Sequence, residues 1–129
     1  MAKGKILVVD DEVYIVHILD FSLSMEGYEV VTAMDGEEAL AKVGVEKPDL
    51  IVLDVMMPKL DGYETCKRLK ENDDTKSIPI ILLSAKGRAV DQKMGLNVGA
   101  TDYVTKPFSP RKLVEKINAI LGIDVQPVS

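Results

Sequence analysis

Reactive side chains follow four short apolar segments of this sequence. They are three carboxylates, one hydroxyl and one ammonium, carried by Asp10, Asp11, Asp54, Ser84 and Lys106. Carboxylates that lie close together repel each other, and a hard divalent cation such as magnesium, which prefers oxygen ligands, relieves that repulsion. A carboxylate can then attack phosphorus while a lysine holds a phosphoryl oxygen. The set therefore favours phosphoryl transfer onto a carboxylate.

Each of these side chains also has an ordinary structural interpretation. Asp10 or Asp11 could cap the start of a helix. Ser84 could close a turn, and Lys106 could be solvated. Asp54 is harder to explain in this way, because a carboxylate that follows four apolar residues is unfavourable to bury without a partner. Four segment ends that each supply a suitable polar group favour one shared site.

Five short apolar segments are expected to form strands, at residues 6–9, 29–32, 50–53, 80–83 and 103–105. Three of them are apolar throughout and do not alternate, which is typical of parallel strands covered on both faces. Ligands of such sheets bind outside the carboxyl ends of the strands. The reactive side chains are therefore expected to converge on one rim of the sheet.

Segments with helical spacing separate these strands. The first carries a stripe of residues that ends before Gly27, formed by Ile15, Ile18, Leu19, Ser22 and Leu23. The others are expected at residues 35–44, 61–69, 88–98 and 110–121. The alternation predicts an α/β fold with a doubly wound, five-stranded parallel sheet and five helices.

The composition describes one globular domain with a negative charge. The chain has 129 residues, of which 47% are hydrophobic and 29% charged, so it can bury a core. Its net charge of −5 argues against a domain that grips nucleic acid itself. No apolar run approaches the roughly 20 residues of a membrane span, and no signal peptide precedes the first strand. The single Cys66 cannot form an internal disulfide, which favours the cytoplasm.

Five motifs, in their order and spacing, resemble the receiver domains of two-component response regulators. They are ILVVDDE at 6–12, DLIVLDVMMP at 49–58, LDG at 60–62, LSA at 83–85 and GATDYVTKPF at 99–108. The resemblance implies a receiver domain over residues 1–122, with residues 123–129 as a tail or the start of a linker. It also implies a flavodoxin-like topology with the strand order 2-1-3-4-5.

The same resemblance assigns roles in phosphorylation. Asp54 would be the phosphoacceptor, a sensor histidine kinase the donor, and Lys106 the partner of the phosphoryl group. Magnesium would be held by Asp54, by Asp11, by the backbone carbonyl of Met56, and by Asp10 through water. Such a domain assists its own phosphorylation and dephosphorylation, but it is not a turnover enzyme. The family also has a cis peptide bond at the position of Lys106–Pro107.

Ser84 and Tyr103 would be the switch residues of the family. The phosphoryl group would draw Ser84 toward the rim, Tyr103 would rotate inward, and the face formed by residues 88–98, 103–105 and 110–121 would change. Receivers of winged-helix transcription factors form homodimers through this face. Asp102 and Lys116 fit their charge pattern, whereas three residues depart from it: Gln92, Thr101 and Lys112. The chain could therefore be a stand-alone receiver that acts by protein contact, or the receiver half of a longer regulator.

Three other classes of protein fit the sequence less well. A haloacid-dehalogenase-like phosphatase also uses a strand-end aspartate, but it needs a second aspartate where this chain has Met56. A flavodoxin cradles phosphate in its first loop, and Asp10, Asp11 and Glu12 would repel that phosphate. A nicotinamide-binding domain needs a glycine-rich turn after the first strand, and the sequence has none there.

Overall fold

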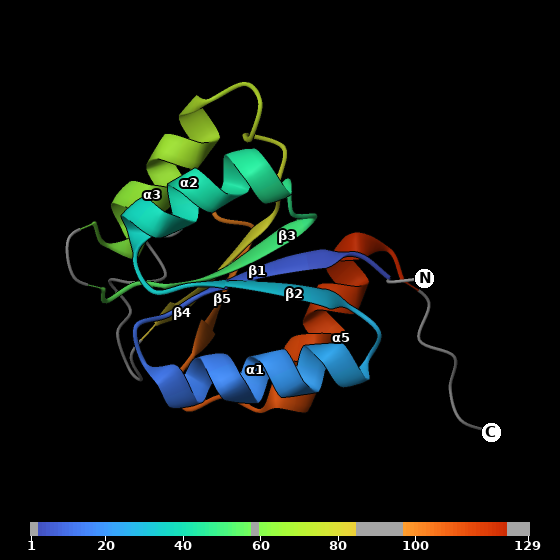
Figure 1. The fold of residues 1–129 in the computed structure, drawn as a ribbon. Coiled ribbons are helices and arrows are strands. Elements are labelled where there is room, and N and C mark those ends of the chain that lie inside the picture. Colours follow the sequence, from blue (N-terminus) through green and yellow to red (C-terminus); the bar gives the residue numbers. More distant parts are fainter. Residues whose placement is uncertain (1–2, 58–59, 85–96, 124–129) are drawn as a thin grey trace.

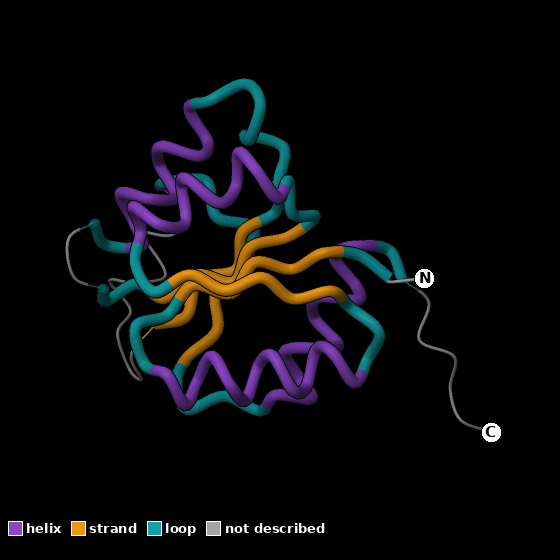
Figure 2. The backbone as a smooth tube through the Cα atoms, viewed as in Figure 1, coloured by secondary structure: helices purple, strands orange, loops and turns teal. Residues whose placement is uncertain are grey.

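The computed structural model describes residues 3–57, 60–84 and 97–123. Five parallel strands form one sheet in the order β2-β1-β3-β4-β5, and helices lie on both of its faces (Figures 1 and 2). The elements are β1 (Lys5–Val9), α1 (Val13–Met25), β2 (Glu29–Ala33), α2 (Gly36–Glu46), β3 (Leu50–Asp54), α3 (Gly62–Glu71), β4 (Ile80–Ser84), β5 (Asp102–Thr105) and α5 (Pro110–Leu121). The predicted fold class and strand order are confirmed.

The two central strands β3 and β4 are buried along their whole length. Their register pairs Ile51 with Ile80 and Asp54 with Leu83, and all five residues of each strand are buried. The edge strands β2 and β5 are mostly half-buried, which matches their weaker apolar character. Continuous apolar runs thus occupy the centre of the sheet because both of its faces are covered there.

Two hydrophobic layers fix the helices to the sheet. On one face, α1 and α5 pack on a cluster that includes Ile6 and Val8. On the other face, α2 and α3 pack on a cluster that includes Leu7 and Val9. The alternating side chains of β1 thus point into the two layers in turn. The layers hold the carboxyl ends of the strands in place.

The structure differs from the sequence expectation in three details. Each strand is one residue longer than its expected apolar segment, and Asp54 and Ser84 end β3 and β4, as expected. Helix α2 continues through Gly44 to Glu46. Ile18 was expected on the buried stripe of α1, but it is 41% exposed, and Val16 is buried instead. The helix expected at 88–98 lies almost entirely outside the described residues.

Three helices begin with a side-chain cap. Asp35, Asp61 and Ser109 precede α2, α3 and α5, and each accepts a hydrogen bond from a backbone N–H of the first turn. Such a cap satisfies a donor that has no partner within the helix. The predicted helix starts at Asp35, Asp61 and Ser109 are therefore confirmed.

Asp61→Ala is expected to lower the free energy of unfolding by about 1 kcal/mol, because the Glu64 N–H loses its acceptor at 2.9 Å. Urea unfolding followed by circular dichroism measures the change. Asp73→Ala is the control, since the Asp73 side chain is 90% exposed and only pairs with Lys76. The control is expected to change stability by less than about 0.5 kcal/mol. Equal effects for the two variants would show that the cap contributes nothing.

Candidate functional site

The carboxyl ends of four strands bring polar side chains to one rim of the sheet. Asp10 follows β1, Asp54 ends β3, Ser84 ends β4, and Lys106 follows β5. In the order β2-β1-β3-β4-β5 the chain reverses direction across the sheet between β1 and β3, and ligands bind at such a point. Asp10 and Asp54 flank that point, as the sequence predicts.

Lys106 holds the carboxylates of the rim together. Its Nζ lies 2.9 Å from Glu12 Oε1, 3.0 Å from Asp10 Oδ2 and 3.3 Å from Asp54 Oδ1. Its backbone N–H donates to the carbonyl oxygen of Ser84 at 2.7 Å. The Lys106–Pro107 peptide bond is cis, as the resemblance implied. Among the described residues, the Lys106 ammonium thus partly offsets the negative charge of the three carboxylates.

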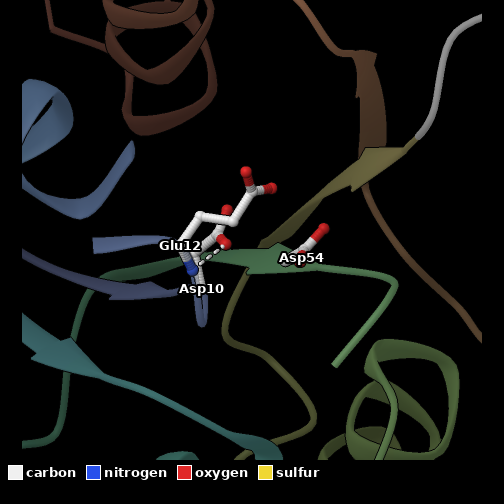
Figure 3. A group of neighbouring side chains, drawn as sticks. All are labelled: Asp10, Glu12 and Asp54. Atoms are coloured by element: carbon white, nitrogen blue, oxygen red, sulfur yellow. Dashed lines mark hydrogen bonds between the residues drawn. The ribbon is translucent and has the colours of Figure 1, made fainter. Parts of the chain in front are cut away.

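Three carboxylates form a compact acidic group at this rim (Figure 3). One oxygen from each of Asp10, Glu12 and Asp54 lies within 4.8 Å of the other two. The Asp10 side chain is fully buried and that of Asp54 is 5% exposed, whereas that of Glu12 is 41% exposed. Oxygen donors with excess negative charge suit a hard divalent cation, so this group fits magnesium.

The two buried carboxyls resist ionisation. Burial, followed by the charge of Asp10, raises the pKa of Asp54 to about 6. Burial also raises the pKa of Asp10, although the Glu12 N–H and Lys106 partly oppose it. A cation at this rim would favour the charged forms of both groups. Without a bound cation, the ionised forms of Asp10 and Asp54 are therefore poorly stabilised.

The charges of Glu12 and Lys106 stabilise each other. Burial alone would lower the pKa of Lys106, but the carboxylates of Glu12 and Asp10 and the charge of Asp54 outweigh it and raise that pKa. The pKa of Glu12 is lowered, first by a hydrogen bond from the Tyr14 hydroxyl and then by Lys106. Lys106 thus remains an ammonium at any physiological pH.

The main chain around Asp54 is closely fixed. The Val55 N–H donates to the carbonyl of Leu83, and the Gly62 N–H donates to the carbonyl of Val55, both at 2.9 Å. A Cβ on Gly62 would lie 2.3 Å from the carbonyl oxygen of Asp54, so only glycine allows α3 to start this close to β3. Hydrogen bonds and close packing therefore fix the backbone that carries the Asp54 carboxylate.

The remaining predicted residues lie at different places. The Ser84 hydroxyl is buried and has no hydrogen-bond partner among the described residues. Tyr103 on β5 is half-buried and packs against the cluster of α2 and α3. Met56 exposes its side chain, and its backbone N–H bonds the Asp54 carboxylate. Asp11 is exposed and lies outside the acidic group, where Glu12 takes the third position.

Glu12 is the residue of the group to which sequence reasoning gave no role. The sequence feature that could have pointed to Glu12 is its position directly after Asp10 and Asp11, in the loop that follows β1. Sequence spacing alone does not decide which side chains of a three-residue acidic loop turn inward, because that depends on the φ and ψ angles at the start of α1.

Solved structures of the same fold define the class of this domain. A putative response regulator from Chloroflexus aurantiacus superposes with a TM-score of 0.89 and 39% sequence identity, and the match covers 92% of this chain and 98% of that one. The sheet order and the flanking helices are those of response regulator receivers. The fold and the acidic rim therefore define a signalling domain.

The family follows from the sequence comparisons. The model of the response regulator receiver domain matches residues 6–118. The chain is 56% identical over 117 residues to the alkaline phosphatase synthesis transcriptional regulatory protein PhoP of Bacillus subtilis. It is 58% identical over 119 residues to the probable transcriptional regulator ycf27 of Cyanophora paradoxa. This chain belongs to the response regulator receiver family of two-component systems.

The chain spans about half the length of these curated relatives. The matches cover 91% and 92% of this chain, but 48% of each relative. Both relatives are transcriptional regulators by name, in line with the resemblance to receivers of transcription factors. Among the described residues, no helix is long and apolar enough to cross a membrane.

Proposed function

We propose that residues 1–122 form a receiver that takes a phosphoryl group from a sensor histidine kinase onto Asp54, and that residues 123–129 form a C-terminal tail or the start of a linker. The observation that carries the proposal is the buried Asp54 carboxylate at the end of β3, with the Lys106 ammonium 3.3 Å away. A nucleophile and a fixed positive charge at this distance provide the positioning and charge stabilisation on which phosphoryl transfer depends.

The transfer forms one bond and breaks another at phosphorus. An Asp54 oxygen attacks the phosphorus of a phosphohistidine, the new O–P bond forms, and the N–P electron pair stays with the imidazole of the kinase. Lys106 holds one phosphoryl oxygen as a point charge. The Ser84 hydroxyl, which is buried without a partner among the described residues, donates to another. The product is an aspartyl-phosphate.

Magnesium is the cofactor that this rim fits. Asp54, Asp11 and the backbone carbonyl of Met56 would hold it, with Asp10 acting through water. Glu12 lies close enough to its neighbours to join this set, since its carboxylate belongs to the acidic group. The cation would supply charge neutralisation for the phosphoryl oxygens. The buried like charges of Asp10 and Asp54 support this assignment.

We infer that the domain is a switch and not an enzyme of repeated turnover. Ser84 and Tyr103 would respond to the phosphoryl group and change the face formed by residues 88–98, β5 and α5. That face could also form a homodimer. Lys116 Nζ and Asp102 Oδ2 lie 2.6 Å apart within this chain. A dimer that uses these two charges would have to exchange this contact for one between copies.

The output of the switch would lie outside this chain. Because the chain spans 48% of each curated relative, an output domain or a separate target protein would receive the signal. We expect that this domain, with a net charge of −5, does not bind DNA itself, and that any DNA contact is made by the output domain or target protein. We place the protein in the cytoplasm, away from the membrane.

A small phosphodonor tests the proposal. Acetyl phosphate and Mg²⁺ are added to the purified chain, and intact mass spectrometry measures phosphate incorporation. Attack by Asp54 would release acetate and add one phosphoryl group to the protein. A chelator is expected to suppress the gain. A chain that gains no phosphate from either acetyl phosphate or phosphoramidate would refute the proposed function.

The aspartyl-phosphate is expected to last for minutes or longer. The residues two positions after Asp54 and Ser84 are Met56 and Lys86, and neither offers a carboxylate or amide that could orient an attacking water. Loss of the phosphoryl group is measured by intact mass after the donor is removed, with Mg²⁺ present. Met56→Asn adds an amide and is expected to shorten the lifetime. Loss within seconds in the unmodified protein would contradict this prediction.

A further inference from the structure

Glu12 stands out among the residues that precede helices. It occupies the N-cap position of α1, but its side chain accepts no capping hydrogen bond from the backbone of that helix. The corresponding side chains of Asp35, Asp61 and Ser109 each bond the first turn of their own helix. The Glu12 carboxylate is therefore directed elsewhere, although its backbone N–H is fixed by Asp10 Oδ1 at 2.9 Å.

The carboxylate of Glu12 turns to the lysine of the rim. Its Oε1 accepts a hydrogen bond from Lys106 Nζ at 2.9 Å. Figure 3 shows Glu12 beside Asp10, with Asp54 on the neighbouring strand. Because the Glu12 side chain is 41% exposed while the other two are nearly buried, Glu12 lies at the mouth of the site.

The contact with Glu12 competes with the role proposed for Lys106, which is to bind a phosphoryl oxygen on Asp54. The ammonium is nearer to Glu12 and Asp10, at 2.9 and 3.0 Å, than to Asp54, at 3.3 Å. A phosphoryl group on Asp54 needs Lys106 as a partner for one of its oxygens. Lys106 has to weaken its bond to Glu12 to supply that contact. The bond then adds to the barrier for transfer, since it is strongest before the phosphoryl group arrives.

We propose that Glu12 is a positioning residue that retains Lys106 at the mouth of the site and so slows the phosphorylation of Asp54. This inference rests on the proposed function. The backbone of Glu12 supports the arrangement, because its N–H is held by Asp10 Oδ1 at 2.9 Å. The rate at which the switch is set would thus depend on a residue other than the nucleophile Asp54.

Glu12→Gln tests the proposal by removing the charge while keeping the shape. With acetyl phosphate and saturating Mg²⁺, its rate of phosphate incorporation is expected to rise about threefold, the ratio that corresponds to about 0.7 kcal/mol for a half-exposed ion pair. Glu46→Gln is the matched control. Glu46 is also half-exposed and pairs with a lysine, Lys5 Nζ at 3.1 Å, but Lys5 begins β1, at the opposite end of the strand from the rim. Its rate is expected to stay unchanged.

A double-mutant cycle separates positioning from a general effect of charge. In a Lys106→Met background, Glu12→Gln is expected to leave the slow residual rate unchanged, because no ammonium remains to be released. The same threefold rise in that background would overturn the proposal and assign the effect to repulsion of the donor. Circular dichroism melts of all variants verify that the chains are folded.

The outcomes distinguish this proposal from the one on which it rests. If the unmodified protein gains no phosphate, the proposed function fails. If it gains phosphate and Glu12→Gln matches Glu46→Gln, only the role of Glu12 fails. A slower Glu12→Gln variant with weakened Mg²⁺ binding by calorimetry would also overturn it, because Glu12 would then serve the metal. A faster variant whose gain requires Lys106 supports it.

Discussion

Asp54→Asn is expected to abolish phosphate incorporation from acetyl phosphate, with a fall of at least about a thousandfold. An amide oxygen is a far weaker nucleophile than a carboxylate, and the substitution keeps the size of the side chain at the end of β3. Lys106 would still be held by Asp10 and Glu12, at 3.0 and 2.9 Å, so the rim stays assembled. Intact mass spectrometry after incubation with donor and Mg²⁺ measures the result.

Asp73→Asn is the control for this experiment. It makes the same chemical change at a side chain that is 90% exposed and pairs only with Lys76. The control is expected to gain one phosphoryl group at the rate of the unmodified protein. One phosphoryl group on Asp54→Asn, at the unmodified rate, would assign the acceptor to another residue. Peptide mapping after reductive trapping would then identify that residue.

The second large effect concerns stability without a metal. In the presence of a chelator at pH 8, Asp54→Asn is expected to raise the free energy of unfolding by up to about 3 kcal/mol. The pKa of Asp54 rises from 3.8 to about 6 on folding. A rise of about two units corresponds to about 3 kcal/mol of unfavourable ionisation in the folded state. The asparagine carries no such charge.

The raised pKa of Asp54 determines how the stability difference between the two proteins changes with pH. Between pH 3.8 and about 6, Asp54 is protonated in a larger fraction of folded molecules than of unfolded ones. The free energy of unfolding therefore falls as pH rises through this window, and the Asp54 contribution is constant above it. The gain from Asp54→Asn is accordingly expected to vanish near pH 4 and to be full at pH 8.

Urea unfolding across this pH range, with Asp73→Asn as the control, measures the difference. Added Mg²⁺ is expected to stabilise the unmodified protein more than Asp54→Asn, because the cation binds the folded carboxylates. A gain in stability that is equal at pH 4 and pH 8 would show that the ionisation of Asp54 is not its cause. A loss of stability at pH 8 would show that the contact with Lys106 outweighs the burial of the charge.

Most of the fold could be predicted from the sequence, since uniform apolar runs such as 50–53 require a sheet covered on both faces. Once the strands are parallel, Asp54 and Ser84 must end on the same rim. The end of α2 could not be predicted in this way. Gly44 lies in open space, where no Cβ would meet a neighbour, so the helix passes it and ends where Lys47 adopts a positive φ of 49°.

The side-chain arrangement within the site could not be predicted from the sequence either. Asp11 and Glu12 are adjacent acids, and only the backbone entry into α1 decides which of them reaches Lys106. Ile18 is similar, because the helical repeat places it near the buried stripe, but the orientation of α1 on the sheet leaves it 41% exposed and buries Val16. These features depend on rotations of a few tens of degrees, which side-chain types do not encode.

The apolar character of the buried strands β3 and β4 also bears on their register. The first four residues of each strand are leucine, isoleucine or valine, so sliding one strand past the other by a residue would still bury apolar surface on both faces. In most sheets, alternating polar and apolar residues prevent such a slip. Here a slip of β3 would force the carboxylate of Asp54 away from Lys106, or a leucine onto the rim. The contact between Asp54 and Lys106 therefore also favours the observed register of β3 and β4.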